Sequence, residues 1–176
     1  MNALLIQPLT PKTYWGFHDA MGIIGKSASM PPLGLVTLAA QLPQQWSLRL
    51  VDLNVEPLRD ADLEWADVLL LTGMLIHAPS MHQVLDRARR AGVRTVVGAP
   101  AASTSPAEFP EADHVFEGEA EERLYTLVDA LERGEGPRHL VPEGGARPRL
   151  AAAPTPRWDL LRRERYVSMS LQYSRG

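Results

Sequence analysis

The chain has 176 residues, of which 45% are hydrophobic and 22% are charged, and its formal net charge is −3. These values are typical of one soluble globular domain with an appendage. The acidic balance argues against a nucleic-acid binder, which would present a basic face. The chain contains no cysteine, which excludes disulfides, thiolate metal sites and a thiol nucleophile within these residues.

The first residues, MNALLIQPL, lack a basic segment and carry only a short apolar run. This pattern is typical of a first strand and not of a signal peptide. No apolar run in the chain approaches the ~20 residues that a transmembrane helix needs. We therefore expect a cytoplasmic protein with no membrane span and no nucleic-acid partner.

Short apolar runs alternate with helical patterns over residues 1–134. Apolar residues at helical spacing follow Pro31-Pro32 and recur over residues 81–88 and 124–131. Two further connections, residues 59–65 and 105–110, allow only a turn or two of helix. The strands are expected at residues 2–7, 48–53, 66–71, 94–97 and 114–116. This alternation predicts a flavodoxin-like (Rossmann-like) α/β fold, with a five-stranded parallel sheet, helices on both faces and an extended C-terminal tail.

The composition changes after residue 134. Residues 134–156 are rich in Gly, Pro, Ala and Arg, which indicates a linker. Over Val167–Tyr173, apolar and polar side chains alternate as in a strand, and a strand without a partner is an exposed edge. We therefore expect an α/β domain over residues 1–134, a linker over 135–165 and a single strand over 166–176.

Ligands of open parallel sheets bind beyond the carboxyl ends of the strands. At these ends the sequence places small, polar and acidic residues, and small residues let a flat, bulky ligand approach the backbone closely. Strand-end turns and acidic helix N-termini would show the same residue types. The candidate binding residues are Gln7, Pro8, Asp52, Leu53, Asn54, Thr72, Gly73, Met74, Gly98, Ala99, Pro100, Glu117, Gly118 and Glu119.

The common nucleotide motifs are missing from these positions. The first strand is followed by neither GxGxxG nor a loop suited to a flavin phosphate, and no GxxxxGK[ST] loop is present. A phosphoacceptor receiver domain would need an acidic pair after the first strand, where Gln7-Pro8 stands. A small nucleotide-binding enzyme is therefore poorly supported.

Eight short segments occur in a characteristic order along nearly the whole chain, and the first is PLTPKTYWGFH at residues 8–18, directly after the first strand. The other seven are MPPLG at residues 30–34, VDLNVEPL at 51–58, LTGM at 71–74, VGAP at 97–100, GEAE at 118–121, PRWD at 156–159 and QYSRG at 172–176. In this order the chain resembles the N-terminal cobalamin-binding domain of class B radical SAM enzymes, nearest to the hopanoid-methylase subgroup.

The resemblance implies that this domain binds cobalamin at the candidate residues named above. Ser174-Arg175-Gly176 resembles the end of the first strand of the radical SAM barrel, just before the cysteines that bind its cluster. The [4Fe–4S] cluster and S-adenosylmethionine would then belong to a missing catalytic domain, which is the expected partner of this one. The fragment alone would not be an enzyme, whereas the full-length parent would be a methyltransferase acting on an unactivated carbon.

One departure from related cobalamin domains concerns the lower face of the corrin. Domains of the methionine synthase kind carry DxHxxG, whose histidine binds cobalt, and Asn54 stands in the histidine position here. An asparagine amide is a poor cobalt ligand. The resemblance therefore implies base-off cobalamin above Leu53 and Asn54, with its nucleotide tail beside residues 72–74 and 98–99. A weaker lower ligand would favour transfer of the methyl group as a radical.

The histidines of the chain show neither HxxxH nor HxH spacing, so no metal site is expected from them. We expect structural or solvated roles, His77 being the least secure because it lies at the ligand-binding end. The alternative hypothesis is a doubly wound interaction or regulatory module without a corrin. Its docking elements would be the exposed strand and the proline-rich tail.

Overall fold

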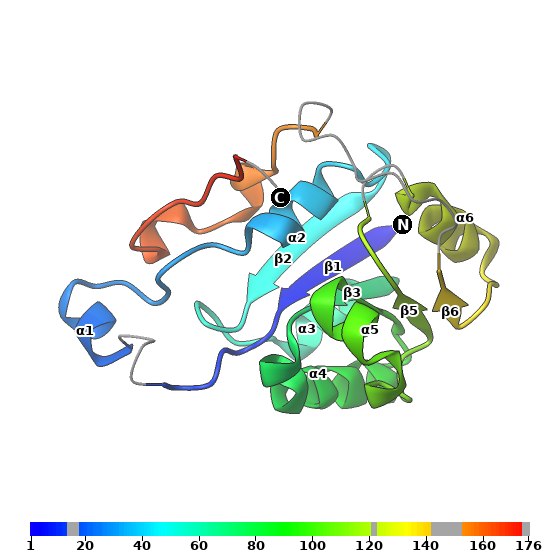
Figure 1. The fold of residues 1–176 in the computed structure, drawn as a ribbon, viewed down its shortest axis with the longest axis horizontal. Helices are drawn as coiled ribbons and strands as arrows, with labels where there is room; N and C mark the ends of the chain where they lie inside the picture. The colour runs from blue at the N-terminus through cyan, green and yellow to red at the C-terminus, as the bar shows by residue number, and fades with distance from the viewer. Residues whose placement is uncertain (14–17, 121–122, 142–152, 174–176) are drawn as a thin grey trace.

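The computed structural model describes residues 1–13, 18–120, 123–141 and 153–173 (Figure 1). Within these ranges, parallel strands form one sheet in the order β2-β1-β3-β4-β5-β6. The strands are β1 (Asn2–Gln7), β2 (Ser47–Asp52), β3 (Val68–Thr72), β4 (Arg94–Gly98), β5 (His114–Phe116) and β6 (His139–Leu140). The predicted parallel α/β sheet is confirmed.

The expected number of five strands was wrong, because β6 adds a sixth at the edge of the sheet. It pairs with β5 through Val115↔His139 and Phe116↔Leu140. A strand of two residues is too short to show the alternation or apolar run by which strands are recognised in a sequence. It lies in the segment that was expected to be a linker.

Strand β1 lies inside the sheet and supplies apolar side chains to both faces. Ala3, Leu4, Leu5 and Ile6 are fully buried. Successive side chains of a strand point to opposite faces, and accordingly Ala3 and Leu5 join one apolar cluster while Leu4 and Ile6 join the other. A strand covered on both sides has no polar face, which explains its continuous apolar sequence.

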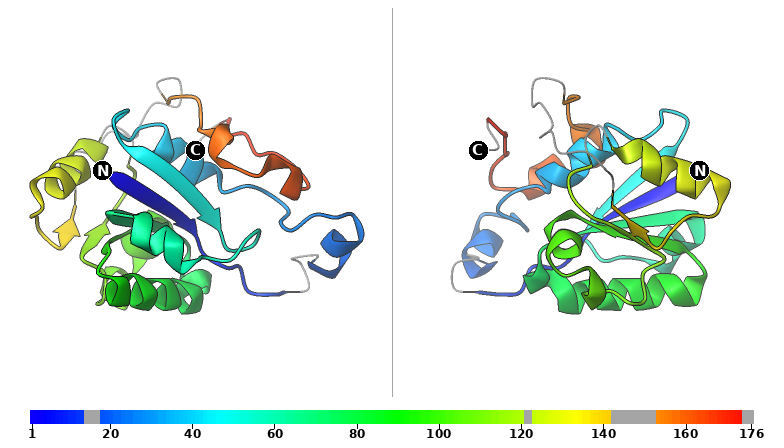
Figure 2. Two further views of the ribbon diagram at one scale, coloured as in Figure 1. Left: turned by 180° about the vertical axis from the view of Figure 1, so that it is seen from behind. Right: turned by 45° about the vertical axis from the view of Figure 1, so that its right-hand side comes forward.

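Helices cover the two faces of the sheet in separate groups (Figures 1 and 2). The cluster on one face includes α2 (Leu33–Ala39) and α6 (Leu124–Arg133). The cluster on the other face includes α3 (Asp60–Trp65), α4 (Ala78–Ala91) and α5 (Ala99–Thr104). Figure 1 shows α1 (His18–Ile23) beyond the arrowheads of β1 and β2, away from the sheet.

Helix α5 begins earlier than expected. The sequence indicated a short helical connection over residues 105–110, whereas α5 starts at Ala99, directly after β4, and only a 3₁₀ turn follows at Pro106–Glu108. Pro100 lies in the first turn of α5, where its missing N–H needs no partner. The residues expected to form a loop after β4 therefore open a helix.

The C-terminal tail packs against the α2 face. Leu161 and Tyr166 are 8% and 4% exposed and belong to the same apolar cluster as α2. The backbone N–H of Arg157 donates to the Val36 carbonyl at 3.0 Å, and that of Val167 donates to the Ala28 carbonyl at 3.0 Å. The tail is therefore held to the α/β layers by both side chains and backbone.

The strand expected over Val167–Tyr173 is not formed in the described residues. Tyr166 makes an isolated parallel bridge with Ala28, and the Ser168 N–H donates to the Ser29 carbonyl at 3.0 Å. Backbone hydrogen bonds pair residues 165–168 with residues 27–29, but this short pairing does not extend into a strand over the described residues that follow. The expected Ser174-Arg175-Gly176 end of this strand lies outside the described residues.

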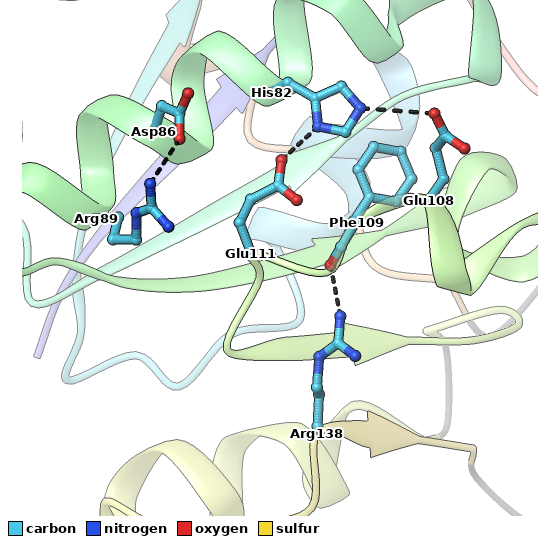
Figure 3. A network of polar contacts seen from close by, with 7 residues as sticks. All are labelled: His82, Asp86, Arg89, Glu108, Phe109, Glu111 and Arg138. Atoms are coloured by element: carbon cyan, nitrogen blue, oxygen red, sulfur yellow. Dashed lines mark hydrogen bonds and ion pairs between the residues drawn. The ribbon is translucent and has the colours of Figure 1, made fainter.

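A polar cluster holds the connection between α5 and β5 against α4 (Figure 3). His82 of α4 bonds Glu111 through Nδ1, and its Nε2 lies 3.7 Å from a Glu108 oxygen. Phe109, fully buried, lies between the two glutamates in sequence, with its ring centroid 5.5 Å from that of His82. Arg138 donates to the Phe109 carbonyl at 2.7 Å. The hydrogen bond to Glu111 is the main factor that raises the pKa of His82.

This cluster predicts a pH-dependent contribution to stability. A histidine pKa raised by folding gives stability that is complete below the unfolded value of 6.5 and lost as pH rises through the folded value. We expect the melting temperature of wild type to exceed that of Glu111→Gln most below pH 6.5, with the gap shrinking above it. Thermal melts of both proteins from pH 5.5 to 8.5 measure the gap, and a constant gap would contradict the assignment.

Candidate functional site

The sheet brings four of the five expected loops to one edge. Strand β1 pairs with β2 on one side and with β3 on the other, so the order in which strands are added to the sheet reverses at β1. Open α/β sheets bind their ligands at such a reversal, beyond the carboxyl ends of the strands. In the register of the sheet, Gln7 lies opposite Asp52 and Thr72 lies opposite Gly98. The predicted residues at the ends of β1, β2, β3 and β4 are thus neighbours.

The fifth loop lies further along the same edge. The Glu117 carboxylate accepts a bond from His139 Nδ1 at 3.2 Å, and the Gly118 N–H donates to Ser103 Oγ of α5 at 2.8 Å. Two of the three residues predicted there therefore connect β5 to β6 and α5. This loop is separated from β1 by two strands.

Asn54 ties the loop after β2 to the loop after β1. Its Oδ1 accepts the Thr10 N–H at 2.9 Å, and its Nδ2 donates to the Pro8 carbonyl at 3.2 Å and to Asp52 Oδ1 at 2.7 Å. The amide of Asn54 is therefore already engaged on both its oxygen and its nitrogen. Coordination of a metal by Asn54 would require these bonds to break.

Asp52 is the buried acid of this edge, 3% exposed. It accepts the Asn54 N–H at 2.9 Å on Oδ1 and the Tyr166 hydroxyl at 2.9 Å on Oδ2. Burial raises the pKa of the Asp52 carboxyl, and the hydrogen bonds from Asn54 and Tyr166 act in the opposite direction. With each oxygen engaged by a donor, Asp52 serves to hold the surrounding loops.

Gly73 is a packing position and not an open one. A Cβ at this residue would lie 2.8 Å from Met81 Sδ and 3.2 Å from Pro8 Cγ. Glycine is therefore needed here so that Pro8 and helix α4 can approach β3. The sequence left open a binding position or a strand-end turn for Gly73, and the structure adds a third role, close packing within the domain.

His77 was not in the predicted binding set, and the structure gives it a local role. The ring is 5% exposed, its Nδ1 accepts the Met74 N–H at 3.0 Å, and its Nε2 lies 3.5 Å from Thr10 Oγ1. An Nδ1 that accepts must be unprotonated, and burial lowers the pKa of His77, which favours the neutral ring. Neither nitrogen is directed freely into solvent.

Gly98, at the end of β4, differs from Gly73 because no neighbouring side chain closes off its backbone. A Cβ on Gly98 would meet only the Phe116 carbonyl, at 3.9 Å. The next residue, Ala99, has φ +68°, a left-handed conformation that costs a non-glycine residue roughly 1 kcal/mol or more. Gly98 therefore leaves open space at the candidate site, and Ala99 beside it holds a strained backbone conformation.

Apolar side chains with unusual exposure surround this edge. Leu9 after β1 is 51% exposed, and Met74 and Ile76 after β3 are 53% and 54% exposed. Clustered exposed apolar groups mark a surface that binds something apolar. A separate enclosed space at this edge, lined by residues that include the predicted Gln7, Asp52 and Asn54, is only about 120 Å³. The candidate site is thus an open surface and not a closed pocket.

A larger hollow of about 730 Å³ lies between α6 and β6, with Tyr125, Arg133 and Gly136 in its wall. It contains none of the predicted binding residues. No group of three or more His, Asp or Glu side chains able to hold a metal occurs in the described part of the chain. No helix there is long and apolar enough to cross a bilayer.

The sequence reasoning missed Thr10 and Tyr166 at this edge. Thr10 falls within a segment, PLTP, that follows β1 and carried only a weak signal. Tyr166 is separated from Asp52 by 114 residues and lies in a stretch expected to belong to another unit, so nothing in the local pattern pointed to it.

Comparison with known proteins identifies the family. The family described as B12 binding domain matches residues 26–128, a span that contains β2 to β5 and four of the five predicted loops. The chain belongs to the B12-binding domain family. This confirms the resemblance and supports cobalamin as the ligand of the domain.

Two curated relatives of this B12-binding domain are similar over the whole chain. An uncharacterized methyltransferase of Synechocystis is 39% identical, covering 100% of this chain and 33% of the relative. The hopanoid C-2 methylase of Rhodopseudomonas palustris is 30% identical, covering 98% of this chain and 33% of the relative. The chain therefore spans about a third of the length of each of these relatives.

Proposed function

We propose that the chain holds base-off cobalamin, without a histidine lower ligand, for a radical SAM methyltransferase of which it forms one part. The observation that carries this proposal is the open edge of a B12-binding domain, where Gly98 leaves the backbone accessible and apolar side chains remain exposed. A corrin is broad and flat, and its rim carries methyl groups together with amide side chains. An open surface with small residues fits such a group better than a closed cavity does.

The lower face supports a cobalt without a protein nitrogen ligand. Asn54 stands where related domains carry histidine, and its amide is engaged by Thr10, Pro8 and Asp52. His77 has its Nδ1 occupied by the Met74 N–H and its Nε2 beside Thr10. Asn54 and His77, the two side chains considered as lower ligands of the cobalt, are therefore engaged in hydrogen bonds that hold the loops together.

Methylcobalamin supplies a transferable methyl group when it is bound. The residues of this chain would position it: the Asp52–Asn54 turn would hold the loops below the corrin, the ends of β3 and β4 would accommodate its nucleotide tail, and exposed Leu9, Met74 and Ile76 would exclude water from its rim. Radical transfer to an unactivated carbon is the further part of the proposal, favoured by the weak lower ligand.

The catalytic part would come from the remaining length of the parent protein. Both relatives carry methyltransferase or methylase names and are about three times as long as this chain. The [4Fe–4S] cluster and S-adenosylmethionine would be bound there, since this chain has no cysteine to ligate a cluster. The domain division at residues 134 and 165 and a cytoplasmic location belong to the same proposal.

The decisive experiment is a titration of the chain with hydroxocobalamin, followed by gel filtration and an absorbance spectrum. We expect the corrin to coelute with the protein and to show a base-off spectrum. After reduction to cob(II)alamin, electron paramagnetic resonance should show no nitrogen superhyperfine splitting from an axial base. Splitting would contradict the absent lower ligand, whereas failure to bind, here and in a chain extended through the catalytic part, would favour an interaction module without a corrin.

A further inference from the structure

We propose that Tyr166 is a positioning residue for the candidate cofactor surface, acting from the C-terminal tail through Asp52 and Asn54. Its hydroxyl donates to Asp52 Oδ2 at 2.9 Å, in a contact buried from solvent. The two residues are 4% and 3% exposed. Hydrogen bonds to a charged acceptor are stronger than those between neutral groups, so this contact fixes the carboxylate firmly.

The carboxylate passes this constraint on to the loops of the site. Asp52 Oδ1 accepts both the backbone N–H and the side-chain Nδ2 of Asn54, at 2.9 Å and 2.7 Å. Asn54 Oδ1 then accepts the Thr10 N–H at 2.9 Å. A continuous chain of hydrogen bonds thus joins Tyr166 to the loop after β1, where the exposed apolar surface begins with Leu9.

The tail itself is fixed on both sides of Tyr166. The Arg165 carbonyl accepts the Ser27 N–H at 2.8 Å, and the Val167 N–H donates to the Ala28 carbonyl at 3.0 Å. Arg162 forms an ion pair at 2.8 Å with Glu56, four residues after Asp52. These contacts hold the tyrosine hydroxyl in place, so little side-chain freedom is lost when it bonds Asp52.

Packing alone does not account for the hydroxyl. The Tyr166 ring lies in the apolar cluster that contains Leu161, Leu50 and Val36, and a phenylalanine ring would fill the same space. The hydroxyl adds a donor to a buried carboxylate that already has two donors from Asn54. Its effect is to make the position of the site depend on the position of the tail, and therefore on whatever the tail is attached to.

The test compares Tyr166→Phe with Tyr173→Phe in the full 176-residue chain. Tyr173 is 98% exposed, so its substitution removes a hydroxyl from the same tail without removing a buried contact. Amide hydrogen exchange followed by nuclear magnetic resonance reports on Thr10 and Asn54 without any cofactor. Val96 in the buried strand β4 reports on global unfolding.

In Tyr166→Phe we expect the Thr10 and Asn54 amides to exchange about tenfold faster relative to Val96, as the loss of one such hydrogen bond predicts. In Tyr173→Phe we expect no change. An equal acceleration of all three amides would mean that Tyr166 stabilises the fold as a whole, and no acceleration would mean that the contact is idle. Either result would overturn the proposal.

The second readout is the dissociation constant for hydroxocobalamin, and it rests on the proposed function. We expect Tyr166→Phe to weaken binding about three- to tenfold and Tyr173→Phe to leave it unchanged. A local exchange effect with unchanged affinity would overturn the role at the cofactor surface. If wild type itself binds no cobalamin, the proposed function and the cofactor half of this proposal both fail, while the exchange data still decide whether Tyr166 positions the loop.

Discussion

Replacement of Gly98 by tryptophan is expected to weaken hydroxocobalamin binding by more than tenfold while leaving the fold intact. The nearest atom to a Cβ at this position is the Phe116 carbonyl at 3.9 Å, and the Gly98 backbone (φ −136°, ψ −167°) is one that any residue adopts. The added side chain would occupy the space where a corrin would approach the backbone. A tenfold loss corresponds to about 1.4 kcal/mol of binding free energy.

The matched control is Ala91→Trp. Ala91 is exposed at the last residue of α4, next to the start of β4 and thus at the opposite edge of the sheet. Titration with hydroxocobalamin and thermal melts of both variants give affinity and stability together. Equal binding by Gly98→Trp and wild type would move the cofactor away from the end of β4, and unfolding of Gly98→Trp alone would show that the backbone there is not open.

Asp52→Ala is expected to lower the free energy of unfolding by about 2–4 kcal/mol. The substitution removes the acceptor of the buried Tyr166 hydroxyl and one of the two acceptors of the Asn54 side-chain nitrogen. It also releases the turn that binds Thr10 and Pro8 through Asn54. Urea unfolding followed by circular dichroism measures the loss.

Asp52→Asn separates the hydrogen bonds from the charge. Its carbonyl oxygen still accepts from Asn54, and its NH₂ can donate to the Tyr166 oxygen when the hydroxyl rotates. Burial raises the pKa of the Asp52 carboxyl, so a neutral side chain also avoids the cost of keeping a charge away from water. We expect a loss of about 1 kcal/mol or less. Equal losses for the two variants would show that the charge, and not the hydrogen-bond pattern, holds the turn.

The strands and helices could be predicted from the sequence where neighbouring residues define them. The short apolar run within residues 2–7 predicted a strand, and the side chains of residues 3–6 are all fully buried. The spacing of Met81, Val84 and Leu85 predicted a helix, and these residues form the buried face of α4. In both cases the residues that define the element are adjacent or within one helical turn, so periodicity is sufficient.

The elements that sequence missed depend on contacts between distant residues. Strand β6 has two residues and is defined only by its pairing with β5. Tyr166 finds Asp52 across 114 residues, which no periodicity records. The start of α5 at Ala99 was missed because Gly98-Ala99-Pro100 is typical of a turn, although proline also suits the first turn of a helix.

The candidate site, too, could be predicted in part from the sequence and in part only from contacts between distant residues. The sequence placed the binding residues at the carboxyl ends of the strands because this follows from the parallel fold. It treated Gly73 and Gly98 alike, as small residues beside a ligand. Their surroundings separate them: Gly73 is closed in by Met81 and Pro8, whereas Gly98 is open. Only the packing of other elements could distinguish one glycine from the other.

The exposed apolar side chains at the carboxyl edge have a thermal consequence. Leu9, Met74 and Ile76 are each more than half exposed, and ordered water around such groups raises the heat capacity of the free chain. Whatever covers them on binding must release that water, so the heat capacity should fall. The enthalpy of association at this edge will therefore become more negative as the temperature rises.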